Sequence, residues 1–396
     1  MSGVERVAPE QRLRIAVLGD FDGVHTRSWL RWFIDRGHDV HAISYYAPRE
    51  PIAGVTLHVL RPGGGGPGGA TAARGAAGIA GRVSRGLMRL AHALRYQRAG
   101  LGRVVREIAP DVLHAHFVVE HGFYGALAGY HPYVVTAWGS DVLVEPERDV
   151  ITKLIARWTM RRANLLTSNN RYMAERMIAL GALRRKVEMI TLGADREFLD
   201  AHDASVNVRA AHATRAPCII STRAHEPLYN IGEIIDAYGR ASRTHGDARL
   251  LIAHGGSQTV ALQRRALDAG GRIEFAGVLD RAAFRDALTG AEVFVSMPSS
   301  DGTSVALLQA MAAGCFPIVS DLPTQRELVE DGVNGFRVPL HRPEILAERI
   351  GRALDDPALR RAAAARNRAL VEERGLNETE MAKMEALYRR LAARDG

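Results

Sequence analysis

Short runs of hydrophobic residues recur along the whole chain, separated by polar stretches that contain Gly, Pro, Asp and Asn. The runs are rich in Val, Ile and Leu, which is typical of strands buried in a parallel sheet. We predict strands over Leu13–Leu18, Val40–Ser44, Val55–Leu60, Asp111–His116, Asn164–Ser168, Lys186–Leu192, Cys218–Ser221, Leu250–Ala253, Arg272–Gly277, Val293–Met297 and Phe316–Ser320.

Apolar residues at helical spacing follow several of these strands, and Ser299–Gly314 shows the pattern most clearly. Gly302 permits a tight turn, Thr303 or Ser304 can cap the helix, and the helix begins near Val305. This places a small polar loop at the carboxyl end of a strand, where doubly wound sheets bind ligands. The amides and dipole of a helix N-terminus also favour an anion such as a diphosphate. A well-capped helix without a ligand would show the same pattern.

A similar unit opens the chain, where Gly19 and Gly23 separate a strand from a helix predicted over about Thr26 to Arg36. Both glycines are candidates for close approach of the backbone to a substrate. Their spacing does not match G-x-G-x-x-G, so we expect no dinucleotide cofactor. His25, at the start of the helix, is either a cap or surface residue or a substrate contact.

The stretch from Ala70 to Glu107 is predicted to be helical and follows a glycine-rich loop, Pro62–Gly69. It carries eight arginines and one acidic residue, and its leucines and valines are expected to form an apolar side. One interpretation is a pair of amphipathic helices packed on the sheet. The other is a basic surface for an anionic membrane or a charged acceptor.

Composition narrows these alternatives. With 396 residues, 47% of them hydrophobic, the chain can form two ordinary domains. The net charge of +8 favours anionic partners such as nucleotides, phosphates or acidic lipids, and no nucleic-acid-binding motif is present. The two cysteines, Cys218 and Cys315, provide neither a disulfide framework nor zinc-ligand spacing. With no bilayer-length apolar run and no signal-peptide pattern, we expect a cytoplasmic protein, with peripheral contact at the inner membrane face as one reading of residues 70–107.

The order of residues after Val293–Met297 is more specific. Asp301-Gly302, a spacer to Gln309, then Ala-Met-Ala-x-Gly and Pro-x-Val-x-Ser resemble the donor-site signature of glycosyltransferase family 4. Members of this family are retaining, metal-independent enzymes of the GT-B fold. Members of the family normally have Glu at both ends of the spacer, whereas this chain has Asp301 and Gln309.

Other segments extend the resemblance over about residues 13–390. The segment ending at His116 resembles the family's strand with two histidines. Trp138 occupies a position where many members have His, and its flat face could stack on a sugar or an aromatic acceptor. Asp141 follows it, although an aspartate there could equally cap the next helix. Arg223 matches an arginine that neutralises the donor diphosphate, whereas Tyr229 stands where the family has a lysine.

The resemblance implies an α/β protein of GT-B architecture, with two Rossmann-like domains facing a cleft. The implied divisions are an acceptor-binding domain (1–195), a nucleotide-sugar donor domain (196–375) and a C-terminal helix (376–396) that returns to the first domain. Residues 196–217 are expected to be a polar linker.

The implied activity is transfer of a sugar, with retention, from a UDP- or GDP-sugar to a saccharide, a lipid-linked acceptor or a small-molecule natural product. A degenerate nucleotide-sugar-binding protein and a nucleotide-sugar epimerase are the alternatives. We expect no metal and no cofactor. The implied catalytic residues are Asp301, Arg223, Trp138 and Asp141. The implied donor-binding residues are Gly19, Gly23, Arg223, Val278, Asp301, Gly302, Thr303, Ser304, Val305 and Gln309. The implied acceptor-binding residues are His25, His116 and Trp138.

Overall fold

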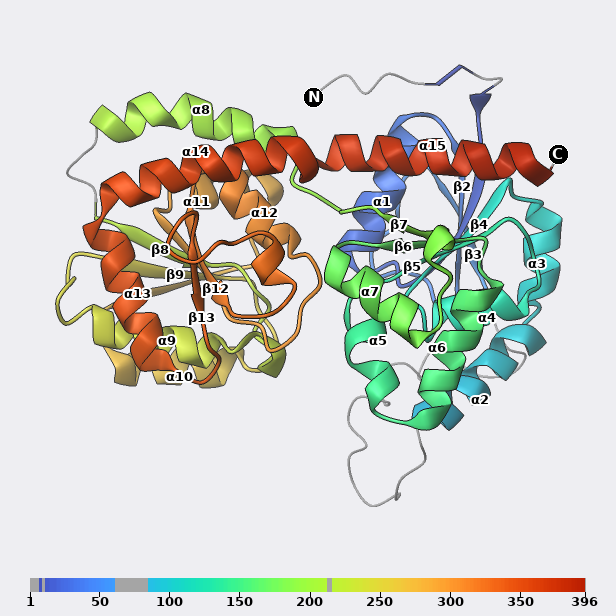
Figure 1. Ribbon diagram of the computed structural model, residues 1–396, viewed down its shortest axis with the longest axis horizontal. Helices are drawn as coiled ribbons and strands as arrows, with labels where there is room; N and C mark the ends of the chain where they lie inside the picture. The colour runs from blue at the N-terminus through green and yellow to red at the C-terminus, as the bar shows by residue number, and fades with distance from the viewer. Residues whose placement is uncertain (1–6, 9–10, 61–84, 212–215, 396) are drawn as a thin grey trace. The chain divides into compact units, whose positions relative to one another are not determined.

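The computed structural model describes residues 7–8, 11–60, 85–211 and 216–395 (Figure 1). The chain divides into two compact units. The first comprises Met1–Ile190 together with Met381–Gly396, and the second comprises Thr191–Glu380. These divisions lie five residues from the predicted domain boundaries at 195 and 375.

The first unit is built on a parallel sheet with the strand order β3-β2-β1-β4-β5-β6-β7. Its strands are β1 (Arg14–Leu18), β2 (Asp39–Ser44), β3 (Val55–Val59), β4 (Val112–His116), β5 (Tyr133–Thr136), β6 (Leu165–Ser168) and β7 (Val187–Met189). Its helices are α1 (Val24–Asp35), α2 (Arg85–Arg98), α3 (Leu101–Ile108), α4 (His121–Leu127), α5 (Ser140–Leu143), α6 (Val150–Arg162) and α7 (Arg171–Leu180). Every residue of β4 is buried, as expected for a central strand covered on both faces.

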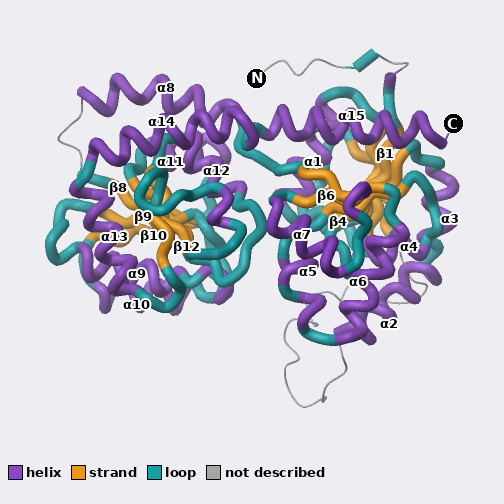
Figure 2. Tube along the Cα trace, in the orientation of Figure 1, coloured by secondary structure: helices purple, strands orange, loops and turns teal. Residues whose placement is uncertain are grey.

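The second unit has a parallel sheet with the order β10-β9-β8-β11-β12-β13. Its strands are β8 (Cys218–Ser221), β9 (Arg249–Ala253), β10 (Arg272–Gly277), β11 (Val293–Ser296), β12 (Phe316–Ser320) and β13 (Phe336–Val338). Its helices are α8 (Arg196–Ala211), α9 (Ile231–Ala241), α10 (Thr259–Ala269), α11 (Arg281–Thr289), α12 (Val305–Ala312), α13 (Pro343–Asp355) and α14 (Pro357–Arg374). In both units the helices surround a sheet in the interior (Figure 2). Two Rossmann-like units with parallel sheets confirm the predicted fold class.

The last helix, α15 (Asn377–Asp395), begins in the second unit and continues in the first. Tyr388 is fully buried there, with its ring stacked 5.1 Å from that of Phe33 and its hydroxyl bonded to His114 Nδ1. Arg36 donates to the carboxylate of Glu385 over 2.6 Å. The apolar side of this helix is therefore packing surface, and the predicted return to the first unit is confirmed.

One expectation about local structure is wrong. The stretch predicted as a polar linker forms α8, because Phe198 and Leu199 anchor it in the core of the second unit. The apolar side expected on the basic helices is present in α2, but it faces outward. That helix buries Gly86, Arg89, Ala93 and Tyr96 and leaves its leucines exposed, so its leucines do not pack it on the sheet. The predicted glycine-rich loop and the first part of the predicted basic helix lie outside the described residues.

Candidate functional site

The carboxyl ends of β8 and β11 are neighbours in the second sheet, at the point where the strand order reverses. Arg223 follows β8 by two residues, and the turn that contains Asp301 and Ser304 follows β11. Ligands bind at such switch points in doubly wound sheets, because the loops on either side diverge there and leave a crevice. The fold thus brings together three residues predicted from sequence.

Arg223 is held by groups on three sides. Its Nη1 donates to Ser304 Oγ over 2.7 Å, and its Nη2 lies 3.0 Å from Asp301 Oδ2. Its guanidinium carbon lies 4.3 Å from the centre of the Tyr229 ring, within the range of a cation–π interaction. Only 11% of the arginine side chain is exposed. A cation fixed in this way needs little reorganisation when it binds an anion.

Ser304 serves both Arg223 and α12. Its hydroxyl oxygen accepts from the backbone N–H of Leu307 over 3.3 Å, so Ser304, and not Thr303, is the N-cap of the helix. Gly302 and Thr303 form the turn before it, and Val305 is the first helical residue. The guanidinium is therefore bonded to the residue that begins α12, where backbone amides and the helix dipole also favour negative charge.

Asp301 is largely buried, with 18% of its side chain exposed. Burial raises the pKa of its carboxyl above the usual value, and the charge of Arg223 together with a hydrogen bond from the Gly302 backbone opposes that rise. The backbone carbonyl of Asp301 accepts from Thr324 Oγ1 over 3.0 Å. The aspartate is consequently held in the same arrangement as the arginine, and it compensates part of the arginine's charge.

Two predicted donor residues lie outside this arrangement. Gln309 is half-buried in the second turn of α12, and Val278 is 78% exposed just after β10, two strands away from β8 in the sheet. The contacts that define the Arg223 arrangement involve neither residue.

Sequence reasoning missed the groups that fix the turn after β11. Asn230 Nδ2 donates to the carbonyl of Met297 and to Ser299 Oγ, each over 2.8 Å. Ser320 Oγ donates to the carbonyl of Pro298 over 2.8 Å. These partners are between 22 and 69 residues apart in the chain, so no local pattern indicates them.

The first unit brings a second group of predicted residues together, at the reversal between β1 and β4. Gly19 follows β1, and a side chain at that position would point toward Thr26 and His116. The ring of Trp138 stacks on exposed His25, with ring centres 5.4 Å apart and an interplanar angle of 19°. Gly23 precedes α1 as its N-cap residue. The carboxyl edge of this sheet therefore carries an aromatic surface beside a glycine loop.

Two residues at this edge face inward. His116 is 2% exposed, Thr26 Oγ1 lies 3.2 Å from its Nδ1, and burial lowers the pKa of its imidazole to about 3. It is neutral at physiological pH and supports the ring of Trp138, 5.3 Å away, from within. The expectation that His116 offers a surface to an acceptor does not fit this burial.

Asp141 is also fully buried. Its Oδ1 accepts from the backbone N–H groups of Trp138 (3.1 Å) and Gly139 (2.8 Å), and its Oδ2 accepts from that of Val118 (2.8 Å). Burial raises the pKa of this carboxyl to about 6, even though these hydrogen bonds lower it. The geometry fits the alternative of a structural residue, because Asp141 holds the loop that carries Trp138 and does not reach the surface.

Trp29, which sequence reasoning did not single out, lies behind the aromatic surface. It is 1% exposed, and its ring contacts those of His114, His116 and Trp138 at 5.2–6.1 Å. Its position one helical turn after His25 is the signal that could have indicated this role.

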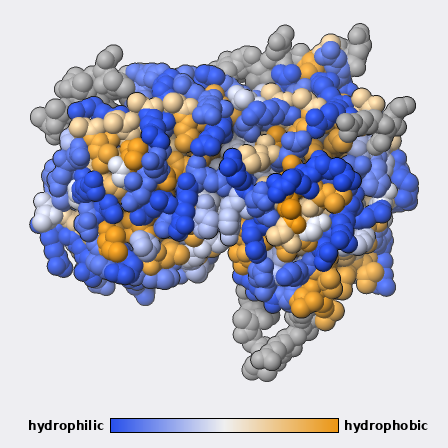
Figure 3. All heavy atoms as spheres, in the orientation of Figure 1, coloured by the Kyte–Doolittle hydropathy of each residue, from blue (hydrophilic) through white to orange (hydrophobic). Residues whose placement is uncertain are grey.

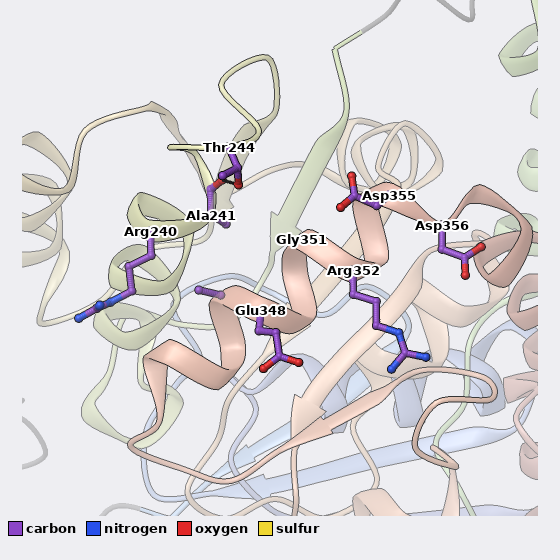
Figure 4. Close-up of a pocket in the computed structure, with 9 residues that line it drawn as sticks. Arg240, Ala241, Thr244, Glu348, Gly351, Arg352, Asp355 and Asp356 are labelled. Carbon is purple, nitrogen blue, oxygen red and sulfur yellow. Dashed lines mark hydrogen bonds between the residues drawn. The ribbon is translucent and has the colours of Figure 1, made fainter.

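An open depression of about 620 Å³ lies elsewhere in the second unit, between α9 and α13 (Figure 4). Side chains of both charges line it, among them Arg240, Glu348, Arg352 and Asp355, and none of the predicted site residues does. Within the described ranges, no group of three or more His, Cys, Asp or Glu side chains is arranged to hold a metal ion. None of the helices described is both long and apolar enough to cross a bilayer.

Two family models match the chain: one described as "Glycosyl transferase 4-like" over residues 14–170, and one described as "Glycosyl transferases group 1" over residues 208–370. Each covers most of one Rossmann-like unit, and together they define a glycosyltransferase of GT-B architecture. The chain belongs to the group 1 glycosyltransferases of family 4.

Relatives and solved structures agree with this assignment. Phosphatidyl-myo-inositol mannosyltransferase of Mycobacterium tuberculosis is 30% identical over 179 residues, which are 43% of this chain and 47% of that protein. The chain spans about half the length of the curated relatives it matches. HepE of Anabaena, solved in complex with UDP, has a TM-score of 0.72 and 16% identity, over 96% of this chain and 100% of that one. Sucrose-phosphate synthase of Thermosynechococcus elongatus has a TM-score of 0.71 and 16% identity, over 96% and 99%. At these identities the solved structures establish the fold.

Proposed function

We propose that this protein transfers a sugar, with retention and without a metal ion, from a UDP- or GDP-sugar to an acceptor. The observation that carries the proposal is the placement of Arg223 against Asp301, Ser304 and Tyr229 at the start of α12. The solved relative that contains UDP lends support to a nucleotide donor.

The leaving group of such a reaction is a nucleoside diphosphate, whose charge grows in the transition state. Arg223 and the amides at Thr303–Val305 would receive that charge, because they are already oriented and need not be reorganised. Asp301 would contact a hydroxyl of the donor sugar, and the Gln309 amide would bond to the ribose. The backbone near Val278 would meet the base. Retention and metal independence remain predictions.

The first unit would bind the acceptor. Gly23 leaves its backbone partly accessible, whereas Gly19 is buried. The stacked pair of His25 and Trp138 offers an apolar face suited to a sugar ring or an aromatic acceptor. We assign His116 and Asp141 to positioning the loop and ring of Trp138. A saccharide, a lipid-linked acceptor and a small-molecule natural product all remain candidates, and contact with an anionic membrane forms part of the proposal.

One observation favours a second candidate, a nucleotide-sugar-binding protein without transfer activity. Asp301 compensates the charge of Arg223, and no second cation stands at Tyr229. Against this candidate, every group around Arg223 keeps the arginine oriented for an anion. Turnover of a nucleotide sugar only in the presence of an acceptor would separate the two candidates.

The first test is thermal unfolding with UDP, GDP, ADP and their sugars, with and without EDTA. A ligand that binds only the folded state raises the unfolding temperature according to its saturation. We expect a shift with one diphosphate that is insensitive to EDTA and lost in Arg223→Ala. Arg265→Ala is the matched control, because Arg265 also pairs with an aspartate, Asp236, but lies on α10. Absence of a shift with every nucleotide would refute the proposed donor class.

A further inference from the structure

Helix α2 exposes its large apolar residues. Leu87, Met88, Leu90 and Leu94 are 48%, 47%, 37% and 60% exposed. The side of the helix that packs inward instead carries Arg89, which donates to Thr152 Oγ1 over 2.9 Å and to Glu145 over 2.7 Å. None of these four residues belongs to the described hydrophobic core of the first unit or is among the side chains packed against it, so packing within the unit does not account for them.

Helix α6 also exposes large apolar residues. Val150, Leu154 and Trp158 recur every four residues, and so lie on one side of the helix, and they are 72%, 59% and 39% exposed. The opposite side holds α6 in place through Ile155, Met160 and their buried neighbours. The outward stripe is therefore not required for the helix to pack.

The two helices are neighbours. A side chain at Gly86 of α2 would meet Ile151 of α6, and the hydrogen bond from Arg89 to Thr152 also joins them. Figures 1 and 2 both place α2 beside α6, and Figure 3 shows apolar residues gathered over α2 at the edge of the first unit. We call the exposed side chains of these two helices the α2–α6 face.

The charge of this face has one sign. Helices α2 and α6 carry eight cationic residues and no acidic one: Arg85, Arg89, Arg95, Arg98, Lys153, Arg157, Arg161 and Arg162. The ion pairs recorded among the described residues engage Arg85 and Arg89 and none of the other six. The cations on α6 alternate with the apolar stripe, one position away from Leu154 and Trp158.

We propose that the α2–α6 face docks on an anionic lipid bilayer. Cations are attracted to the negative surface, while leucine side chains and a tryptophan enter the interface, where tryptophan is favoured. The core of a protein–protein interface is instead depleted of charge, which this face is not. The inference rests on the membrane contact that is part of the proposed function, but not on sugar transfer. It adds α6, which the sequence did not indicate.

The test is flotation of the full chain with vesicles of phosphatidylcholine alone or with about one-third phosphatidylglycerol. We expect binding to the anionic vesicles that weakens as NaCl is raised, because exposed charges are screened by salt. The variant L154S/W158S should lower the bound fraction at least fivefold, and K153Q/R157Q should lower it and flatten the salt dependence. V260S/L267S is the matched control, because these residues are 62% and 84% exposed on α10.

Trp158 also contacts Phe123, with ring centres 5.6 Å apart, so its replacement can disturb the fold. V150S/L154S leaves that contact intact and is the second variant. Thermal shift with nucleotide reports the donor site separately, and it should be unchanged in every variant of the face. Binding to vesicles that is the same in all variants, no binding to anionic vesicles, or a change of oligomeric state caused by the variants would each overturn the proposal.

Discussion

The guanidinium of Arg223 lies 4.3 Å from the centre of the Tyr229 ring. Tyr229 stands where glycosyltransferase family 4 has a lysine. From the sequence alone, this means that one cation fewer is present to bind the diphosphate. In the structure the ring supports the arginine that remains. Tyr229 is the last residue of the short turn Pro227–Tyr229. Asn230, the next residue, donates a hydrogen bond to the carbonyl of Met297 in the loop after β11. With tyrosine in place of lysine, the site therefore has one firmly held cation, Arg223, whereas the family pattern has two cations that share the charge of the diphosphate.

Truncation of Tyr229 tests this support. An exposed cation–π contact is worth about 0.5–1 kcal/mol and a desolvated one about 2 kcal/mol, so Tyr229→Ala should weaken binding of the nucleoside diphosphate by about 2- to 30-fold. Tyr229→Phe keeps the ring and should bind like the unchanged chain. Calorimetric titration measures both, with Tyr172→Ala on α7 as a control for loss of a partly exposed tyrosine. An equal loss in Tyr229→Phe would show that the hydroxyl matters and the ring does not.

The fold was predictable because its signal is local. Uninterrupted apolar runs such as the one in β11 identify buried strands, and the polar turns after them identify the binding edge of each sheet. Arg223, Asp301 and Ser304 follow from that pattern together with the family resemblance. Their contact with one another then follows from the pairing of β8 with β11.

The misses come from long-range contacts. Arg89 is buried only because Glu145 and Thr152, 56 and 63 residues further along, receive its guanidinium, and this turns the leucines of α2 outward. Helix α8 is anchored by Phe198 and Leu199 in a segment that otherwise reads as polar. The hydrogen bond from the backbone amide of Val118 to Asp141, 23 residues further along, is equally invisible in the sequence.

Removing the charge of Asp301 separates its two proposed roles. Asp301→Asn leaves the charge of Arg223 uncompensated, so the affinity for UDP or GDP should stay equal or rise several-fold. Loss of the carboxylate from the donor sugar should lower kcat at least tenfold, which corresponds to about 1.4 kcal/mol. Equilibrium titration and initial rates measure the two effects. Asp321→Asn, which disrupts pairs with Arg326 and Arg337 after β12, is the control. Affinity lost to the extent seen in Arg223→Ala would mean that Asp301 mainly positions the arginine.

Replacement of Gly19 and of Gly256 by alanine should have opposite effects on stability. A Cβ at Gly19 would lie no closer than 3.6 Å to Thr26 or His116, so Gly19→Ala should change Tm by no more than about 2 °C. A Cβ at Gly256 would lie 2.7 Å from the carbonyl oxygen of His225, so Gly256→Ala should destabilise the second unit by about 1–3 kcal/mol. Sugar transfer should nevertheless fall in Gly19→Ala, because the new methyl group would contact His116, which supports the Trp138 ring of the proposed acceptor site. Full activity in that variant would show that Gly19 has no role in substrate binding.

Asp141→Asn should destabilise the first unit by about 1–2 kcal/mol. One carboxylate oxygen would be replaced by an NH2 group, which cannot accept the hydrogen bonds that the backbone N–H groups donate to Asp141. The folded pKa of about 6 lies above the usual value of 3.8, so stability falls as the pH rises from about 3.8 to about 6 and Asp141 ionises in the folded protein. That part of the pH dependence should disappear in the variant. Activity per folded molecule should fall less than threefold. A hundredfold fall in activity per folded molecule at unchanged Tm would instead show that Asp141 acts in catalysis.

The carboxylate of Glu385 gives the opposite pH dependence. Burial acts to raise its pKa, but hydrogen bonds from His38, Arg389 and Arg36 outweigh that effect and lower the pKa to about 2. A depressed pKa contributes stability that is present above the unfolded value of about 4.5 and is lost as the pH falls toward 2. Allowing for screening by solvent, we expect the contribution at neutral pH to be about 1–2 kcal/mol.

Glu385→Gln should therefore lower the Tm of the first unit at pH 7, and the difference from the unchanged chain should narrow progressively below about pH 4.5. Circular dichroism melts between pH 7 and pH 3.5 measure this, with Glu373→Gln, an exposed glutamate on α14, as the control. Because Glu385 lies on α15 and its partners Arg36 and His38 follow α1, the variant also measures how firmly the last helix is held to the first unit. A Tm difference that is constant across this pH range would mean that the carboxylate contributes through its shape and not through its charge.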